Sequence, residues 1–353
     1  MEIIRFVIDF LSFYTIYLML SISLNLEYGY AGISNFGKVM FFAGGAFTAG
    51  ALATRLTILL TQGRWIGIEE FINSDVILGS NVSLFFAKNP LFGVFMFLFL
   101  LVLAMAVSAI LGYIASYPAI RLREDYLGMT LIVSGELLRN IAKNYEPLVC
   151  GTFGVYVPNP FSWVSGLHRD LFLLSLLLAF SGGTWIVMEY LLNSPFGRVL
   201  KAMRESEDVV ESYGRDIVKL RIKTLMLGSA IAGLAGGLYA FYTGSVHPDD
   251  FTTTRTFLVW VIVIIGGVGN NLGAAVGAFF YVLIDRLIAY YKHSIYLPFD
   301  VNYMSYIILS IILILVIFYS PQGIFPEKPT RTPVIEKLRE RQKEKIKVQA
   351  PSS

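Results

Sequence analysis

The chain has 353 residues, of which 56% are hydrophobic and 15% charged, and its formal net charge is only +3. Its mean hydropathy of +0.65 argues for a polytopic membrane protein, because few soluble chains could hide so much apolar surface. The small charge does not call for nucleic acid. The single cysteine, Cys150, excludes an intramolecular disulfide and a cysteine-based metal cluster, and the three separated histidines predict no metal site.

Apolar segments follow one another along the whole chain, and most have about the 20 residues that a membrane-spanning helix needs. The first lacks a small-residue cleavage site, so we expect it to be retained. We therefore predict an all-α polytopic protein with about nine spans, of which the seventh is short: Ile3–Leu24, Phe36–Leu60, Leu91–Tyr117, Tyr126–Tyr145, Leu171–Leu192, Ile222–Tyr242, Thr254–Val268, Gly273–Tyr291 and Tyr303–Tyr319.

The basic residues between these segments are unevenly distributed. Pro118–Asp125, Asn193–Arg221 and the tail after Pro321 are rich in lysine and arginine. The alternate loops are poor in them: Thr61–Pro90, Glu146–Asp170 and Lys292–Asn302. The positive-inside rule places the rich loops in the cytoplasm. We expect an external N-terminus, a cytoplasmic C-terminus, a transmembrane domain over 1–323 and a charged cytoplasmic tail over 324–353, which is either solvated or binds a partner.

The loop 194–221 is charged, although its neighbours are apolar. Ser194-Pro195 is a good helix start, apolar residues then recur at helical spacing with an interruption at Ser206, and Gly214 stands where a C-terminal cap is needed. A short helix with an apolar face and a charged rim suits a groove on a soluble partner, although a solvated connection would show a similar composition. The docking residues predicted are Arg198, Val199, Met203, Arg204, Asp208, Val210, Tyr213 and Gly214.

Four motifs carry a resemblance to a known family. The loop has the acid, small residues and glycine of the cytoplasmic coupling helix of ABC importer permeases, as Asp208-Val209-Val210 followed by Gly214. More closely, the chain resembles the LivM-type permease of branched-chain amino-acid ABC importers, over Gly29–Phe47 ("GYAGISNFGKVMFFAGGAF"), Tyr117–Asn140, Ser194–Ala240 and Leu258–Ala278. These four stretches occur in the order of the family.

The resemblance implies a non-enzymatic permease subunit in a prokaryotic cell membrane, importing branched-chain amino acids. Its partners would be a second permease of the LivH type, two cytoplasmic ATPases that bind the ATP, and an extracellular binding protein. Departures from the family pattern put the cargo in doubt: Asn35 stands for a serine, Lys38 for a histidine, and Val149-Cys150-Gly151 for a Thr-Gly-Gly segment.

Glycines interrupt one apolar segment in each half of the chain, a pattern that points to a central pathway but that close helix packing would also explain. The predicted path residues are Gly32, Asn35, Phe36, Gly37, Lys38, Phe41, Gly266, Gly267 and Gly269. The second stretch also resembles a dinucleotide-binding glycine loop, but its flanks are membrane segments and its third glycine is one residue late, so we expect no cofactor in this chain.

Glu136 and Arg139 lie in the middle of an apolar segment, three residues apart, where they can pair on one helix face. Ionisable groups at that depth are costly and often functional. A coupling carboxylate would make the chain an ion-coupled secondary transporter of small amphipathic solutes, which is the alternative function. A pair that neutralises itself would instead anchor one helix inside the bundle.

Overall fold

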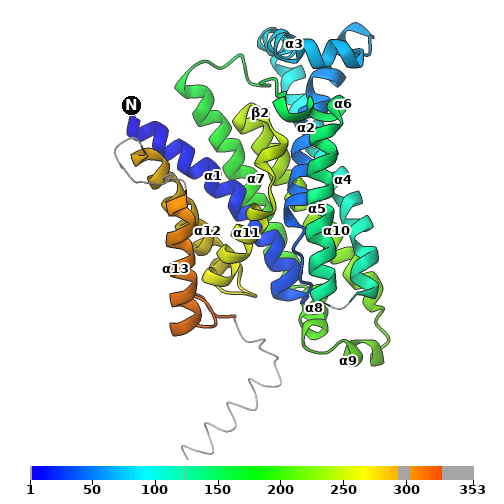
Figure 1. Cartoon of the computed structure of the whole chain (residues 1–353), viewed down its shortest axis with the longest axis vertical. Coiled ribbons are helices and arrows are strands. Elements are labelled where there is room, and N and C mark those ends of the chain that lie inside the picture. The colour runs from blue at the N-terminus through cyan, green and yellow to red at the C-terminus, as the bar shows by residue number, and fades with distance from the viewer. Residues whose placement is uncertain (1, 123, 293–302, 328–353) are drawn as a thin grey trace, which may run out of the picture.

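A computed structural model describes residues 2–122, 124–292 and 303–327 (Figure 1). Within these ranges the chain is all-α apart from one short pairing of two strands. Every apolar segment predicted above is a helix, with ends within a few residues of those expected: α1 Glu2–Leu24, α2 Lys38–Gln62, α4 Pro90–Arg121, α5 Glu124–Asn144, α7 Leu167–Asn193, α10 Ile217–Thr243, α11 Thr253–Gly266, α12 Asn271–Tyr291 and α13 Tyr303–Tyr319.

Among the described residues, six helices are long and apolar enough to cross a membrane: α1 with its π-helical extension η1 (Asn25–Tyr30), α2, α4, α7, α10 and α12. The chain is thus a multi-pass membrane protein. The other three predicted spans differ in kind, because α11 has 14 residues, α13 has 17, and α5 carries too many polar residues.

The centre of the bundle is formed by α2 and α10. In the most apolar 18-residue stretch of each helix, 83% of the residues are buried in α2 and 78% in α10. The corresponding share is 33% in the peripheral helices α4 and α7. Glycines make this close packing possible: a Cβ on Gly45 of α2 would lie 2.1 Å from the carbonyl oxygen of Gly233 in α10. In lipid, such small residues let helices associate where no hydrophobic driving force exists between them.

The two ends of the molecule are built differently. At the lower end in Figure 1 lie the short helices α8 (Pro195–Glu205) and α9 (Glu207–Ser212). At the upper end lie α3 (Ile68–Lys88) and α6 (Glu146–Val149). The 3-10 turns η2 (Gly151–Phe153) and η3 (Pro248–Asp250) follow α6 and precede α11, and the strands β1 (Val155–Tyr156) and β2 (Ser245–Val246) pair in antiparallel register.

One expectation about the connections was wrong. The stretch 61–90 was expected to be a loop, but residues 68–88 form the helix α3, which bends at Ser74. Its charges, with Glu69 and Glu70 in the first turn, prevent it from resembling a span. The predicted loop 292–302 and the tail from residue 328 onward lie outside the described residues, save Lys292 at the end of α12.

Candidate functional site

The two glycine-rich interruptions meet inside the bundle. The backbone leaves the helical conformation at residues 31–37, between η1 and α2, and again at 267–270, between α11 and α12. A Cβ on Gly29 would lie 2.6 Å from the backbone nitrogen of Gly269, and that nitrogen donates to Asn25 Oδ1 at 2.9 Å. Asn25 Nδ2 in turn donates to Asn271 Oδ1 at 3.0 Å. Two breaks more than 200 residues apart thus form one junction.

Arg204 of α8 attaches the charged loop to this junction. Its guanidinium donates to the carbonyl oxygen of Gly29 and pairs with Glu327 at 2.7 Å. A Cβ on Gly32, whose φ is +71°, would lie 3.0 Å from Arg204 Cγ. Lys201, one helical turn earlier, also pairs with Glu327 at 2.9 Å. The end of α8 is therefore bonded to η1 and to Glu327, and it lies against the second break, where a Cβ on Gly269 would lie 3.2 Å from Arg204 Nη1.

A buried ion pair spans the first break. Lys38 Nζ lies 2.8 Å from Glu27 Oε2, and both side chains are fully enclosed, at 1% and 0% exposure. Asn35 Nδ2 donates to the same carboxylate oxygen at 2.8 Å, and Asn35 Oδ1 accepts from the backbone nitrogen of Gly37 at 2.9 Å. Since unpaired buried charges are expensive, this network holds η1 against the first turn of α2. Glu27 was missed from sequence, although a lysine at the edge of an apolar segment indicates a buried acid nearby.

Aromatic side chains close over the first break. The Phe36 ring stacks on Trp260 of α11 with centroids 4.4 Å apart and planes 9° apart, and Tyr28 lies 4.4 Å from the same indole. Trp260 Nε1 donates to the carbonyl oxygen of Asn35 at 3.1 Å. Phe41 is fully buried one turn into α2. The predicted path residues of this half are therefore packed against protein in the conformation that the structure shows.

The predicted glycines of the second break contact the C-terminal segment. A Cβ on Gly267, whose φ is +124°, would lie 2.1 Å from the carbonyl oxygen of Phe325, and the Phe325 nitrogen donates to the Gly266 oxygen at 2.9 Å. On its other side Gly266 approaches Gly273, whose oxygen would lie 2.0 Å from an added Cβ. A side chain at either position would collide with backbone, so close packing accounts for these glycines.

The charged loop has the local structure that its sequence predicts. The Ser194 side chain accepts from the Phe196 nitrogen and caps α8, with proline at its first turn. Ser206 is extended and separates α8 from α9. After α9, Gly214 at φ +72° donates to the Glu211 oxygen while the next nitrogen donates to Val210. These two bonds form a Schellman cap.

The apolar face of the charged loop points inward, which corrects the interpretation made from the sequence. Met203 and Val210 were expected on a docking surface, but they are 2% and 4% exposed and pack into this chain. Val199 is half-buried. The apolar residues of the loop's end that face outward are Tyr213, at 82% exposure, and Val209, at 51%, and Arg198 and Asp208 are exposed as well. The face that helical spacing identified is mostly the internal face of the loop.

The charged residues of α5 form a network with η3 and with the first residue of α11. Arg139 pairs with Glu136 at 2.8 Å and with Asp249 at 2.8 Å, while Thr253 Oγ1 donates to Glu136 at 2.5 Å. Lys143 pairs with Asp249 at 3.0 Å, and its hydrogen bond lowers the pKa of the Asp249 carboxyl below its usual value. The Glu136–Arg139 pair therefore connects α5 to η3 and α11. Its side chains are partly exposed, Glu136 at 33% and Arg139 at 21%.

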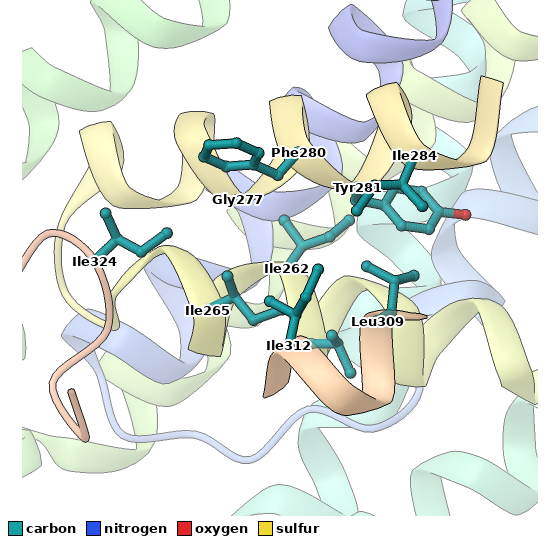
Figure 2. Close-up of a pocket in the computed structure, with 10 residues that line it drawn as sticks. Ile262, Ile265, Gly277, Phe280, Tyr281, Ile284, Leu309, Ile312 and Ile324 are labelled. Carbon is teal, nitrogen blue, oxygen red and sulfur yellow. The ribbon is translucent and has the colours of Figure 1, made fainter. Parts of the chain in front are cut away.

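An apolar pocket of about 200 Å³ lies between α11, α12 and α13 (Figure 2). Phe280, Tyr281 and Ile284 approach it from α12, Ile262 and Ile265 from α11, and Leu309 and Ile312 from α13. The predicted path residues do not line it. Within the described residues, three or more histidines, cysteines or acids do not gather into a group that could hold a metal ion.

The comparisons with known proteins agree on one family. The model of the family described as branched-chain amino acid transport system / permease component matches residues 6–317. The chain is 37% identical to the probable branched-chain amino acid transport permease protein LivM of Methanocaldococcus jannaschii, over 93% of this chain and 95% of the relative.

Two further relatives show the breadth of the family. The high-affinity branched-chain amino acid transport system permease protein LivM of Escherichia coli is 27% identical over 91% of this chain and 70% of its own length. The probable permease protein LivH of M. jannaschii is 28% identical over 78% of this chain and 86% of its own length. No solved structure matches the chain significantly.

Proposed function

Since the chain belongs to the branched-chain amino acid transport permease family, and is a permease component of such an ABC transport system rather than an enzyme, we propose how it works within the assembly. It pairs with a second permease of the LivH type, because a LivH protein is itself a relative over most of this chain. Two cytoplasmic ATPases bind the ATP, and an external binding protein delivers leucine, isoleucine or valine. The membrane is that of a prokaryotic cell.

The observation that carries this mechanism is the position of Arg204. It joins α8 to Gly29 of η1 and to Glu327, and it lies against Gly269 of the second break, where an added Cβ would lie 3.2 Å from its Nη1. A force on the charged loop is therefore transmitted to segments that adjoin the two places where the bundle lacks continuous helical hydrogen bonds. Short breaks between packed helices act as hinges, because a few residues can absorb large changes in φ and ψ. ATP-driven movement of the ATPases would open the Phe36–Trp260 closure through this link.

The surface that an ATPase contacts is the outward face of α9. Val209 and the C-cap Tyr213 are its exposed apolar residues, and the charged residues Arg198, Glu205 and Asp208 are exposed on the same loop. Exposed aromatic residues are the typical energetic centres of an interface, whereas rim charges contribute little each. Met203 and Val210 support this face from inside the permease, so they transmit force without touching the partner.

The topology that fits this mechanism has nine crossings. The helices α5, α11 and α13 are shorter or more polar than the other six, but they lie within the same bundle. With them as crossings, the loops rich in lysine and arginine all fall on one side of the membrane. This arrangement places α8, α9 and Glu327 in the cytoplasm and α3 and α6 outside, with an external N-terminus. The polar residues of α5 then face protein and the pathway in preference to lipid.

Co-purification of the ATPases with the tagged chain tests the proposal. We expect Tyr213→Asp with Val209→Asp to release the ATPases and abolish ATP-driven leucine uptake in proteoliposomes, since two charges would be buried unpaired in the interface. Val218→Asp, a similarly exposed apolar site at the start of α10, is the matched control and should retain both. Normal assembly and uptake in the double variant would refute the docking face.

A further inference from the structure

The segment that follows α13, residues 320–327, lies against the second break and is called here the C-terminal strap. A turn fixes its start to α13: the Ser320 nitrogen donates to the Val316 oxygen at 2.7 Å, and the Gly323 nitrogen donates to the Ser320 oxygen at 2.8 Å. A Cβ on Gly323, whose φ is +80°, would lie 2.4 Å from Gly267 Cα. The strap therefore leaves α13 in close contact with the backbone of the second break.

The strap supplies hydrogen bonds that the end of α11 lacks. The last four carbonyl groups of a helix have no partner within it. Two such oxygens accept from the strap, that of Ile265 from the Ile324 nitrogen at 3.0 Å and that of Gly266 from the Phe325 nitrogen at 2.9 Å. In Figure 2, Ile324 reaches from the strap to one end of the apolar pocket, whose wall it shares with Ile265. The strap is thus bonded to the helix end itself.

The last two residues of the strap join the start of α12 to the end of α8. The Pro326 oxygen accepts from Nδ2 of Asn270, which is also the N-cap of α12, at 3.0 Å. Glu327 then pairs with Lys201 at 2.9 Å and with Arg204 at 2.7 Å. One short segment therefore holds both sides of the second break and is held by α8.

These two ion pairs give α8 a bonded route to the second break. Arg204 itself donates to Gly29 of η1, at the first break, whereas it only lies close to Gly269 of the second. The side chains of the pairs are between 20% and 27% exposed, and pairs exposed to solvent contribute little to the free energy of unfolding. One carboxylate that holds two cations of the same helix does, however, fix the position of that helix. The effect of Glu327 is therefore mainly geometric.

We propose that Glu327 is a positioning residue of the transport cycle, which makes the α11–α12 break follow the movement of α8 through the C-terminal strap. This role rests on the proposed function, in which the ATPases move the charged loop. Movement of α8 then reaches the first break through Gly29 and the second through Glu327. Without the strap contact, α11 and α12 lag behind α8, and ATP is hydrolysed with less transport.

The test measures leucine uptake per ATP hydrolysed, in proteoliposomes that contain the complete importer and its binding protein. Glu327→Gln keeps the size of the side chain and removes its charge. We expect it to lower this ratio by about fivefold or more, the lower end of a coupling between two sites. The ATPases should still co-purify, and the thermal midpoint should stay within about 1 °C of that of the unmodified importer.

Two further variants separate the strap from its surroundings. Asn270→Ser can still cap α12 but is too short to reach the Pro326 oxygen, so it should lower the ratio in the same direction. Asp216→Asn is the matched control, because the pair of Asp216 with Lys219 lies at the start of α10 and reaches neither break. It should leave the ratio unchanged.

A covalent link in place of the ion pair tests the role of the contact directly. In a Cys150→Ser background, Lys201→Cys with Glu327→Cys should resemble Glu327→Gln. A flexible bis-methanethiosulfonate reagent that joins the two thiols should restore the ratio, and reduction of the link should remove the recovery. A linked pair that stays uncoupled would overturn the proposal, because the strap would then have to separate from α8.

The remaining outcomes are equally decisive. A ratio in Glu327→Gln equal to that of the unmodified importer would overturn the role of the strap. A clearly lower midpoint or loss of the ATPases in this variant would do the same, because it would assign Glu327 a purely structural role. Failure of the proposed function looks different: it would appear in the unmodified importer as leucine uptake that does not depend on ATP.

Discussion

Replacement of Lys38 by methionine should destabilise the permease through the charge that it leaves behind. Glu27 would remain fully buried with Asn35 as its single partner, because its other carboxylate oxygen has no partner among the described residues. Removal of one member of a buried ion pair typically costs about 3–5 kcal/mol. Methionine fills nearly the same volume, so little of this loss comes from a cavity.

The magnitude can be converted to a temperature. An unfolding entropy of ~2.1 cal/mol/K per residue gives about 0.7 kcal/mol/K for a chain of this length, so a loss of ~4 kcal/mol should lower the Tm by about 5 °C. Size-exclusion chromatography of the tagged importer in detergent after heating measures this shift. Lys143→Met, which removes a partly exposed pair with Asp249, is the control and should cost less than about 1 kcal/mol.

The double variant Glu27→Gln with Lys38→Met isolates the interaction. It removes both charges and leaves an amide that still accepts from Asn35, so we expect it to recover most of the lost Tm. A Tm for Lys38→Met within about 1 °C of the unmodified importer would refute the argument that this pair holds the first break together. A double variant as unstable as the sum of the two single ones would show that the charges are not coupled.

Three further predictions concern other parts of the chain. In a cysteine-free background, a cysteine at Ser206 should react in intact cells only with membrane-permeant thiol reagents and one at Ser80 also with impermeant ones; labelling of position 206 from outside would reverse the topology. Glu136→Gln should lower the stability by about 1 kcal/mol and leave uptake dependent on ATP, whereas uptake driven by an ion gradient alone and lost in this variant would favour a secondary transporter. Gly45→Leu should cost about 1–3 kcal/mol or more in a melting assay because it forces α2 away from α10, while Gly182→Leu on α7, where an added Cβ meets nothing within 4 Å, should be tolerated.

The sequence by itself determined the helices and their local signals. A membrane span is specified by about 20 consecutive apolar residues and a helix end by the residues within one turn, so both can be recognised without knowledge of any neighbour. The cap at Ser194, the interruption at Ser206 and the Gly214 cap were predicted for this reason. The helix α3 was missed because its first turn carries two acids and polar residues such as Asn73, Asp75 and Asn81 interrupt its apolar runs.

Only the tertiary structure decided what each apolar face and each charge would meet. Helical spacing identified Met203 and Val210 as residues that must be covered, but this chain, and not a partner, covers them. The contact between Gly29 and Gly269 joins residues 240 positions apart, and the partner of Lys38 and the two partners of Glu327 appear only once the helices are packed. The physical reason is that periodicity records how much surface must leave water or lipid, whereas the packing of distant segments selects the surface that covers it.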